Sequence, residues 1–361
     1  MANYQIWVLN DDYSRSILFA NTMTRKSWVG LRYRMALNGM DSATLTVLAH
    51  DPGLAKLDVP NQRLLILRDG QVVFGGRLDS EAWAILPTSP GDDDVYPIGA
   101  VGYAAYAQFR AQLPPAGHDV HNLSGPLDDV AKALIRTNLG SGADAARQYP
   151  DLTVAADVGL GAATHHRWRG MTVYRRLEDL AAEANGQLWW RFVPSETGVE
   201  FVTRWGLWGE DKSTGKAVFA IDRANFLEMA YRRDAGGHVN YIYAAGANAG
   251  AARIIEIIQD PAAIAAWGRR ERWLDRRDAQ ETEVLVAEAE IELAKGRVFE
   301  GMTVVPRHNT WPGMWDLGDK VRVQAKRYGR EYIHEAIVKS VTVTVTPDEL
   351  EIVEPEFVTH G

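Results

Sequence analysis

Two hairpin patterns, one near each end of the chain, constrain the fold more than any other feature. The first joins 64–67 to 72–78 through Arg68-Asp69-Gly70, and the second joins 321–323 to 332–338 through 326–329. Each pattern is a β-rich run, a charged turn that contains glycine, and a second β-rich run of similar length. Asp-Gly favours a hairpin because glycine readily adopts the positive φ of a primed turn. The recurrence predicts two related β-domains in one polypeptide.

Length and composition indicate a soluble, multi-domain globular protein. With 361 residues the chain favours two to four domains, and 46% hydrophobic residues argue against global disorder. The absence of cysteine excludes disulfides, thiolate metal sites and cysteine nucleophiles. The net charge of −8 makes nucleic acid an unexpected partner, since duplex-binding surfaces are usually basic. Twelve tryptophans and thirteen tyrosines favour subunit interfaces.

The sequence shows neither a membrane span nor a secretion signal. No run approaches the ~20 consecutive apolar residues of a spanning helix. The first seven residues lack the basic and then apolar order of a signal peptide. We therefore expect the protein to be made and assembled in the cytoplasm.

The pattern along the chain predicts a mainly β fold with α+β parts. We expect a first β-domain, a barrel or sandwich, over 1–108, and a small α+β domain over 109–212 with helices near 127–139 and 172–185. The second β-domain is expected to combine 213–250 with 317–361, and its strands to end in the alternating run 341–346. Residues 251–316 are expected to form an insertion with helices near 261–267 and 279–295, the second bearing a solvated face of glutamates.

Several short motifs resemble ligand sites without meeting their requirements. The segment 209–216 lacks the glycine spacing and the Mg²⁺-binding hydroxyl of a phosphate loop, and 159–161 lacks the third glycine of a dinucleotide fingerprint. We interpret both as loops. Two pairs of histidines do not meet the requirements of a metal site, because the first pair lies in a Pro- and Gly-rich loop and the second pair is adjacent, so that in a strand its members point to opposite faces; they are His118, His121, His165 and His166. The acidic run 92–94 is better explained as an exposed loop than as a calcium site.

One basic cluster, 269–278, carries a tryptophan and leaves two interpretations open. Single-stranded nucleic acid binds to arginines interleaved with aromatic rings. The acidic residues within the same run favour an ion-paired element at a subunit contact equally well. No Gly-x-Ser-x-Gly elbow is present. We predict no catalytic, cofactor-binding or metal-binding residues, no cofactor, and no enzymatic activity.

Phrases spread over most of the chain resemble the tail-tip or baseplate hub proteins of long-tailed, siphovirus-like bacteriophages. Near the start they are 31–39, followed by a strand that ends in Asp51-Pro52, and the Val-Phe-Gly-Gly-Arg step at 73–77. In the second half they are 267–278, similar to the insertion of these hubs, and 317–323, similar to the return into their second barrel. Their order along the chain is more specific than any single phrase.

The resemblance implies a structural virion protein at the phage tail tip with two tail-tube-related β-barrels per chain. Three chains would then form a ring with pseudo-sixfold symmetry. Such a ring docks on the hexameric tail tube or a distal tail protein and carries a central spike, fibre or tape-measure protein. Phage DNA would pass through the lumen without specific binding, and an acidic lumen would suit the net charge. Some relatives carry wall-degrading C-terminal extensions, and the end of this chain near 354–357 argues against one here.

Two alternatives stay open beside the hub interpretation. The first is a carbohydrate-binding or cell-wall-degrading tail-tip protein that uses exposed Trp189, Trp205 or Trp208. The second is the hub of a contractile injection device. The sequence does not specify the host, the receptor or the neighbouring tail proteins.

Overall fold

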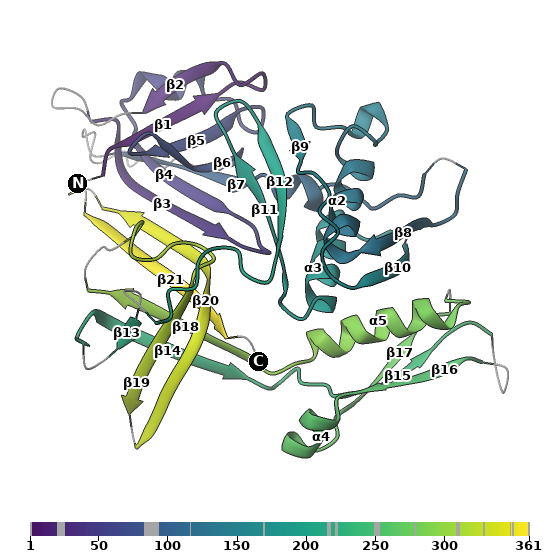
Figure 1. Ribbon diagram of the computed structural model, residues 1–361. Coiled ribbons are helices and arrows are strands. Elements are labelled where there is room, and N and C mark those ends of the chain that lie inside the picture. The colour runs from purple at the N-terminus through teal and green to yellow at the C-terminus, as the bar shows by residue number, and fades with distance from the viewer. Residues whose placement is uncertain are drawn as a thin grey trace.

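The computed structural model (Figure 1) shows one large sheet, three small sheets and five α-helices in the residues that it describes. These residues are 2–19, 26–82, 94–115, 117–168, 170–214, 218–220, 223–248, 253–277, 279–307, 311–327, 329–346, 348 and 350–359. The mainly β fold with α+β parts is confirmed. No described helix is long and apolar enough to span a membrane.

The first half of the large sheet comes from the N-terminal hundred residues. Its strands lie in the order β3-β4-β7-β6-β5-β1-β2. The expected hairpin is β5–β6, and its turn has positive φ at Asp69 (51°) and Gly70 (77°), as a primed turn requires. The strands are β1 Tyr4–Leu9, β2 Arg15–Phe19, β3 Trp28–Ala36, β4 Ser42–Leu48, β5 Arg63–Arg68, β6 Gln71–Glu81 and β7 Val95–Gly102, with a 3₁₀ turn at Pro52–Lys56.

The second half of the large sheet comes mostly from the C-terminal part of the chain. Its order is β14-β18-β21-β20-β19-β13, and β19–β20 is the second expected hairpin. The expectation that the strands end at 346 is wrong, because 341–345 continues β20 and a further strand, β21, follows. The strands are β13 Val218–Ala220, β14 Phe226–Asp234, β18 Phe299–Pro306, β19 Lys320–Arg327, β20 Arg330–Val345 and β21 Glu351–Thr359.

The two halves are one sheet, not two closed barrels. The distal part of β20 pairs with β3, so the strand order runs continuously from β14 to β2 (Figure 1). One apolar core follows the join: it holds Leu31 and Leu45 of the first half together with Val304 and Val343 of the second. Within the described residues we find an open, curled sheet, which corrects the barrel form of the expectation. Local alternation predicts strands, whereas closure depends on long-range pairing.

The α+β part packs beside the first half around its own apolar core. Helices α2 and α3 form as expected, and α3 begins after Thr172, whose hydroxyl accepts a hydrogen bond from the Arg175 N–H. Strands β8 and β10 form one small sheet, and β9, β11 and β12 form another. The elements are α1 Ala105–Gln108, β8 His121–Pro126, α2 Leu127–Asn138, a 3₁₀ turn at Ala145–Arg147, β9 Leu152–Val154, β10 Ala163–Trp168, α3 Val173–Glu183, β11 Leu188–Pro194 and β12 Val199–Trp205.

The inserted unit connects β14 to β18 and is placed differently from the expected 251–316. Residues 241–245 belong to its small sheet, and 299–306 belong to the large sheet, so the insertion spans 235–298. Helix α4 begins after Asp260, which caps it by accepting the Ala263 N–H. The elements are β15 Tyr241–Ala245, β16 Ile255–Gln259, α4 Pro261–Trp267, β17 Glu271–Asp275 and α5 Thr282–Lys295.

Candidate interaction site

The two halves of the large sheet repeat one topology. In the first half the neighbours are β1-β5-β6-β7-β4-β3, and in the second they are β13-β19-β20-β21-β18-β14. The order of these six strands along the chain is also the same. All corresponding pairs are antiparallel except one, since β13 runs parallel to β19 where β1 runs antiparallel to β5. The repeated hairpin is therefore part of a repeated six-strand unit.

The irregularities of the sheet recur at matching positions. The β3–β4 register shifts between Trp28 and Gly30, and the β14–β18 register shifts between Phe226 and Glu228. The β6–β7 register shifts at 78–80, and the β20–β21 register shifts at 338–340. Bulges are specific features of a strand pair, so two matching bulges fix the alignment of the halves residue by residue.

This alignment places Tyr33 of β3 at the same position as Tyr231 of β14. Tyr33 lies opposite Ala43 and Tyr231 opposite Met302, in each case three positions before the residue that pairs next to the bulge, Thr46 or Val305. The spacing of an aromatic residue and a tyrosine five positions later, at 28–33 and 226–231, is visible in the sequence. This spacing is the sequence signal that identifies β14 as the counterpart of β3.

The site of greatest functional interest is the joint where β20 pairs with β3. The register runs from Ser340 opposite Ala36 to Val345 opposite Leu31. At the bulge the Leu37 N–H donates a hydrogen bond of 2.9 Å to the Lys339 carbonyl, which continues the ladder past its last pair. The first part of β20, before the bulge, pairs instead with β19. One edge of β20 is thus shared between a strand of its own half and a strand of the other half.

A largely buried ion pair ties the halves together near the joint. Glu351 at the start of β21 accepts two hydrogen bonds from the Arg68 guanidinium, with Oε1–Nε at 2.7 Å and Oε2–Nη2 at 2.8 Å. The Tyr4 hydroxyl donates to the same carboxylate, and burial raises the pKa of Tyr4 far above its ordinary value. Charged hydrogen bonds of this bidentate kind are about twice as strong as neutral ones. They fix the first half against the second.

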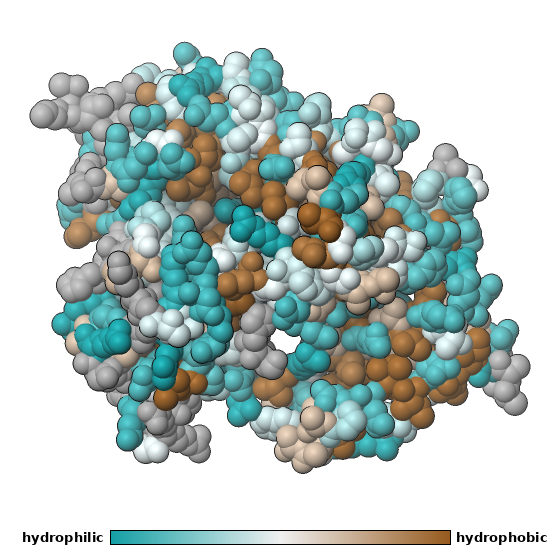
Figure 2. All heavy atoms as spheres, viewed as in Figure 1, coloured by the Kyte–Doolittle hydropathy of each residue, from teal (hydrophilic) through white to brown (hydrophobic). Residues whose placement is uncertain are grey.

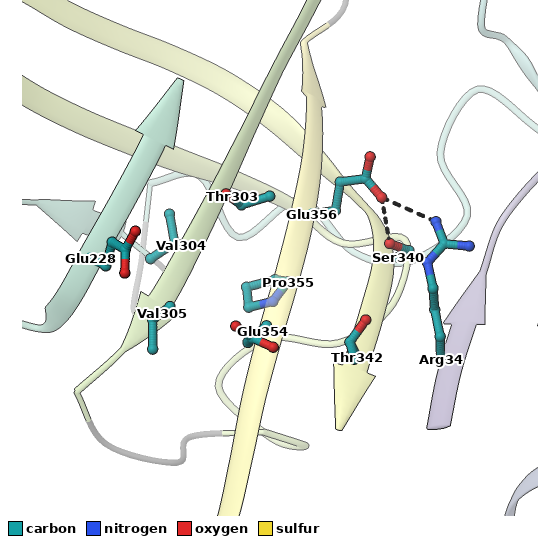
Figure 3. Close-up of a pocket in the computed structure, with 10 residues that line it drawn as sticks. All are labelled: Arg34, Glu228, Thr303, Val304, Val305, Ser340, Thr342, Glu354, Pro355 and Glu356. Carbon is teal, nitrogen blue, oxygen red and sulfur yellow. Dashed lines mark hydrogen bonds and ion pairs between the residues drawn. The ribbon is translucent and has the colours of Figure 1, made fainter. Parts of the chain in front are cut away.

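The other face of the joint is polar and slightly hollowed (Figure 3). Glu356 accepts hydrogen bonds from the Ser340 hydroxyl (2.7 Å) and the Arg34 guanidinium (3.1 Å), as the dashed lines show. Burial acts to raise the pKa of Glu356, but these two donors outweigh it and the pKa lies below its ordinary value. The hollow has a volume of about 250 Å³ and is also lined by Glu228, Thr303, Val304, Val305, Thr342, Glu354 and Pro355.

The short link between β3 and β4 anchors the α+β part. The Asn38 side chain donates to the Leu188 carbonyl (2.8 Å) and accepts from the Trp190 N–H (2.6 Å). Arg191 pairs with Asp41 at 3.1 Å, and burial raises the pKa of that carboxyl. The matching link in the second half carries the whole inserted unit instead.

The histidines do not come together as a metal site. His118 is exposed in a loop, whereas His121 is buried on β8 and burial lowers its pKa. His165 and His166 point to opposite faces of β10, as expected, and His166 contacts Glu183 at 3.0 Å. In the described part of the chain no three His, Cys, Asp or Glu side chains gather as metal ligands do.

The remaining candidate segments are loops or ion-paired surfaces. Two loops are only partly described: 215–216 of the glycine loop at 209–216 and residues 92–93 of the acidic run lie outside the described residues. The 159–161 segment is an exposed loop before β10. In the basic cluster, Arg269 pairs with Glu271, and Arg276 pairs with Glu288 of α5. Ion pairing is therefore confirmed for the cluster.

Two expectations about side chains are wrong. Trp189 is buried in the main core, because β11 lies against the large sheet, and Trp205 and Trp208 are half-buried. Glu288 is not on a solvated face, since Arg276 and Arg176 of the α+β part surround it. Helical periodicity identifies one apolar stripe, but it does not show that a second neighbour covers a charged face.

The comparisons with known proteins agree with this architecture. A family model described as Siphovirus ReqiPepy6 Gp37-like protein matches residues 12–357. The tail protein from Neisseria meningitidis MC58 has a similar structure, with a TM-score of 0.61, 15% identity, and coverage of 99% of this chain and 97% of that one. The 43 kDa tail protein of prophage MuSo2 from Shewanella oneidensis gives a TM-score of 0.60 at 12% identity and 98% coverage of both chains. The prophage tail protein gp18 from Listeria monocytogenes EGD-e gives 0.52 at 12% identity, covering 98% of this chain and 94% of that one. No curated protein is significantly similar in sequence.

Proposed function

Because this chain belongs to the family of Siphovirus ReqiPepy6 Gp37-like proteins, we propose that it forms a homotrimeric hub ring at the distal end of a phage tail. The chain is a structural protein of the phage tail and has the fold of other tail proteins. In the proposed ring it adapts the sixfold tail tube to a threefold tip, spike or fibre. The name of the family favours a long flexible tail over a contractile injection device.

The repeated six-strand unit is the observation that carries this proposal. A chain with two matching units occupies two adjacent positions in a ring, so three chains supply six positions. The joint between β20 and β3 is a contact between unlike surfaces, β20 from one unit and β3 from the other. Contacts between unlike surfaces produce rings when the rotation closes. The proposed hub therefore has threefold symmetry in its chains and nearly sixfold symmetry in its six-strand units.

The polar face of the joined sheet suits a channel wall. The opposite face is committed to the apolar core, whereas this face presents Arg34, Thr342 and Glu356 around the shallow hollow. Its charges are of both signs, so the wall would be polar without being strongly basic, and DNA would pass without being held. The partners of the ring are the tail tube or distal tail protein on one side and a central spike, fibre or tape-measure protein on the other.

The proposed role is structural, without catalysis or a cofactor. Two of the ionisable groups described above serve contacts between elements: Glu351 joins the halves, and Asp41 joins the first half to β11. We assign none of them to a substrate.

The mass of the purified full-length chain tests the proposal. Native mass spectrometry of a 40.1 kDa chain is expected to give a species of three chains. Incubation with purified peptidoglycan is expected to release no fragments. A strict monomer that cleaves glycans would contradict the hub.

A carbohydrate-binding role is the second candidate, and one observation favours it. The face of the β15–β16–β17 sheet turned away from α5 exposes Trp273 (53%), Ile255 and Ile257 beside the Tyr243 ring. Figure 2 shows hydrophobic residues gathered over this inserted unit at the lower right. Aromatic rings of this kind also suit sugar rings. Binding of host glycans that is lost in Trp273→Ala and retained in Trp189→Phe would support this role over a purely structural one.

A further inference from the structure

The repeat also specifies which strand edges join neighbouring chains. We propose that β14 of one chain pairs antiparallel with the end of β6 of the next chain, in the register that β3 and β20 use within a chain. This inference rests on the proposed trimer and adds the contact that holds it. It names a second copy of the chain as the occupant of a free sheet edge.

The alignment of the halves shows which strands between chains correspond to the β3–β20 pair within a chain. By the shared bulges, β14 corresponds to β3, and the end of β6 after its bulge corresponds to β20 after its bulge. A hydrogen bond beside each bulge supports the match: the Leu78 N–H donates to Gln62 (3.0 Å), and the Val338 N–H donates to Asp319 (2.9 Å). Gln62 and Asp319 each immediately precede the first strand of their hairpin.

The register then follows by counting from the bulge. Within the chain Ser340 lies opposite Ala36, and the next pairs are 341 with 35 and 342 with 34. The corresponding pairs between chains are Ser80 with Asp234, Glu81 with Arg233, and Ala82 with Arg232. The described part of this edge ends at residue 82.

Both edges lack a strand partner in the described part of the chain. Strand β14 is the end of the large sheet and pairs with β18 alone. Beyond its bulge, β6 pairs with β7 on one side, and β5 has already ended at Arg63. Leu227 on β14 is 66% exposed, and Asp79–Ala82 are all exposed. An open edge is a template for another strand, and native proteins usually cover or protect it.

The charges of the two edges are complementary. In the proposed register Arg233 on β14 faces Glu81 on the neighbouring β6. Within the chain, Arg34 occupies the position of Arg232 and pairs across the sheet with Glu356. Opposite charges on facing strands stabilise pairing, whereas like charges in this arrangement destabilise it. A second copy therefore fits this edge in both backbone register and charge.

Cysteine crosslinking tests the register without interference, because the chain has no cysteines of its own. Facing residues of antiparallel strands have Cα atoms about 4.5–5.5 Å apart, which a disulfide can bridge. The test variant is Ala82→Cys with Arg232→Cys. A positive control is Arg34→Cys with Thr342→Cys, the corresponding pair inside one chain. A negative control is Ala82→Cys with Glu200→Cys, which places the second thiol on exposed β12.

On mild oxidation the test variant is expected to migrate at three times the 40.1 kDa chain in a denaturing gel. The intrachain control is expected to form its disulfide without change of mass, and the negative control to stay a single chain. A mixture of the two single-cysteine proteins is expected to give a covalent dimer, since the proposed bond joins different chains.

The outcomes separate this inference from the proposed function. A trimer by native mass without the 82–232 crosslink would overturn the edge contact and leave the trimer standing. A monomer that forms no crosslink would overturn both. Charge reversal adds a second measurement: Arg233→Glu is expected to weaken the trimer, and adding Glu81→Arg is expected to restore it. Loss without restoration would contradict the charge pairing.

Discussion

Strands β3 and β14 hold the same position in two copies of one unit, yet they differ in what lies across their outer edge. Strand β3 is paired with β20, and Tyr33 is completely buried. Strand β14 has no such neighbour in the described residues, and the matching Tyr231 is half-buried. The same strand position is thus core in one copy and surface in the other. The difference teaches that burial here depends on the strand across the edge.

The links that follow these strands also differ. After β3 the chain turns at 37–41 and anchors the α+β part through Asn38. After β14 it leaves the sheet for 235–298 before returning as β18. The sheet is repeated while its attachments have diverged. In a ring of three chains, such attachments would appear three times on a nearly sixfold wall.

Removing the ion pair between the halves is expected to destabilise the protein strongly. Glu351→Ala leaves the Arg68 guanidinium and Tyr4 hydroxyl buried without their main acceptor. We expect a loss of about 3 kcal/mol in the free energy of unfolding, the usual scale for breaking a buried pair. Urea unfolding followed by tryptophan fluorescence measures it. Glu354→Ala on the same strand is the matched control and is expected to change stability by less than about 0.5 kcal/mol. Equal losses of unfolding free energy in both variants would show that the Glu351 ion pair does not hold the two halves together.

The two tyrosines offer a direct comparison of paired and unpaired edges. Tyr33→Ala is expected to lose about 3–5 kcal/mol, as for other buried aromatic residues. Tyr231→Ala is expected to lower the free energy of unfolding clearly less at protein concentrations that favour single chains, because Tyr231 is only half-buried. Urea unfolding at low and high protein concentration measures both. A Tyr231→Ala loss equal to that of Tyr33→Ala at low concentration would show that the edges do not differ.

The sequence predicted the local elements of both halves better than their assembly. The hairpins β5–β6 and β19–β20 and helices α2–α5 follow from turn residues and from apolar periodicity. The β20–β3 joint does not, because it brings together residues about 300 apart whose local patterns specify strands without specifying partners. The boundary of the insertion depends on the same long-range pairing, because 241–245 and 299–306 lie in different sheets. The burial of Trp189 depends on how β11 docks, and no local signal contains that information.

The Asn38 link is expected to have an intermediate effect, confined to the first half. Asn38→Ala removes two hydrogen bonds to β11 and leaves the Trp190 N–H without its acceptor. A loss of about 1–3 kcal/mol is expected, the scale of an unsatisfied buried group. Hydrogen exchange should increase in β11 and β12 and stay unchanged in the inserted unit. Asn61→Ala, at an exposed position, is the control. An equal increase in hydrogen exchange through the whole chain would show that the effect of Asn38 is not confined to this link.

The smallest expected effect is the pH dependence contributed by Glu356. Its pKa in the folded protein lies below the ordinary 4.5. The folded state therefore binds the proton less readily than the unfolded chain does, and the stabilisation is present above pH 4.5. It is lost as pH falls through the lower folded pKa. Because the pair with Arg34 is partly exposed, we expect less than about 1 kcal/mol. Unfolding of the wild type and Glu356→Gln from pH 7 to 3 measures the difference, and parallel profiles would contradict it.

End-on electron micrographs of the purified full-length protein test the central claim most directly. The account expects rings of three chains, with an inner wall of six similar sheet segments and three outer protrusions from the inserted units. Rings of six chains would contradict it, because each chain would then fill one position instead of two. Isolated single chains at the concentrations that support tail assembly would contradict it as well.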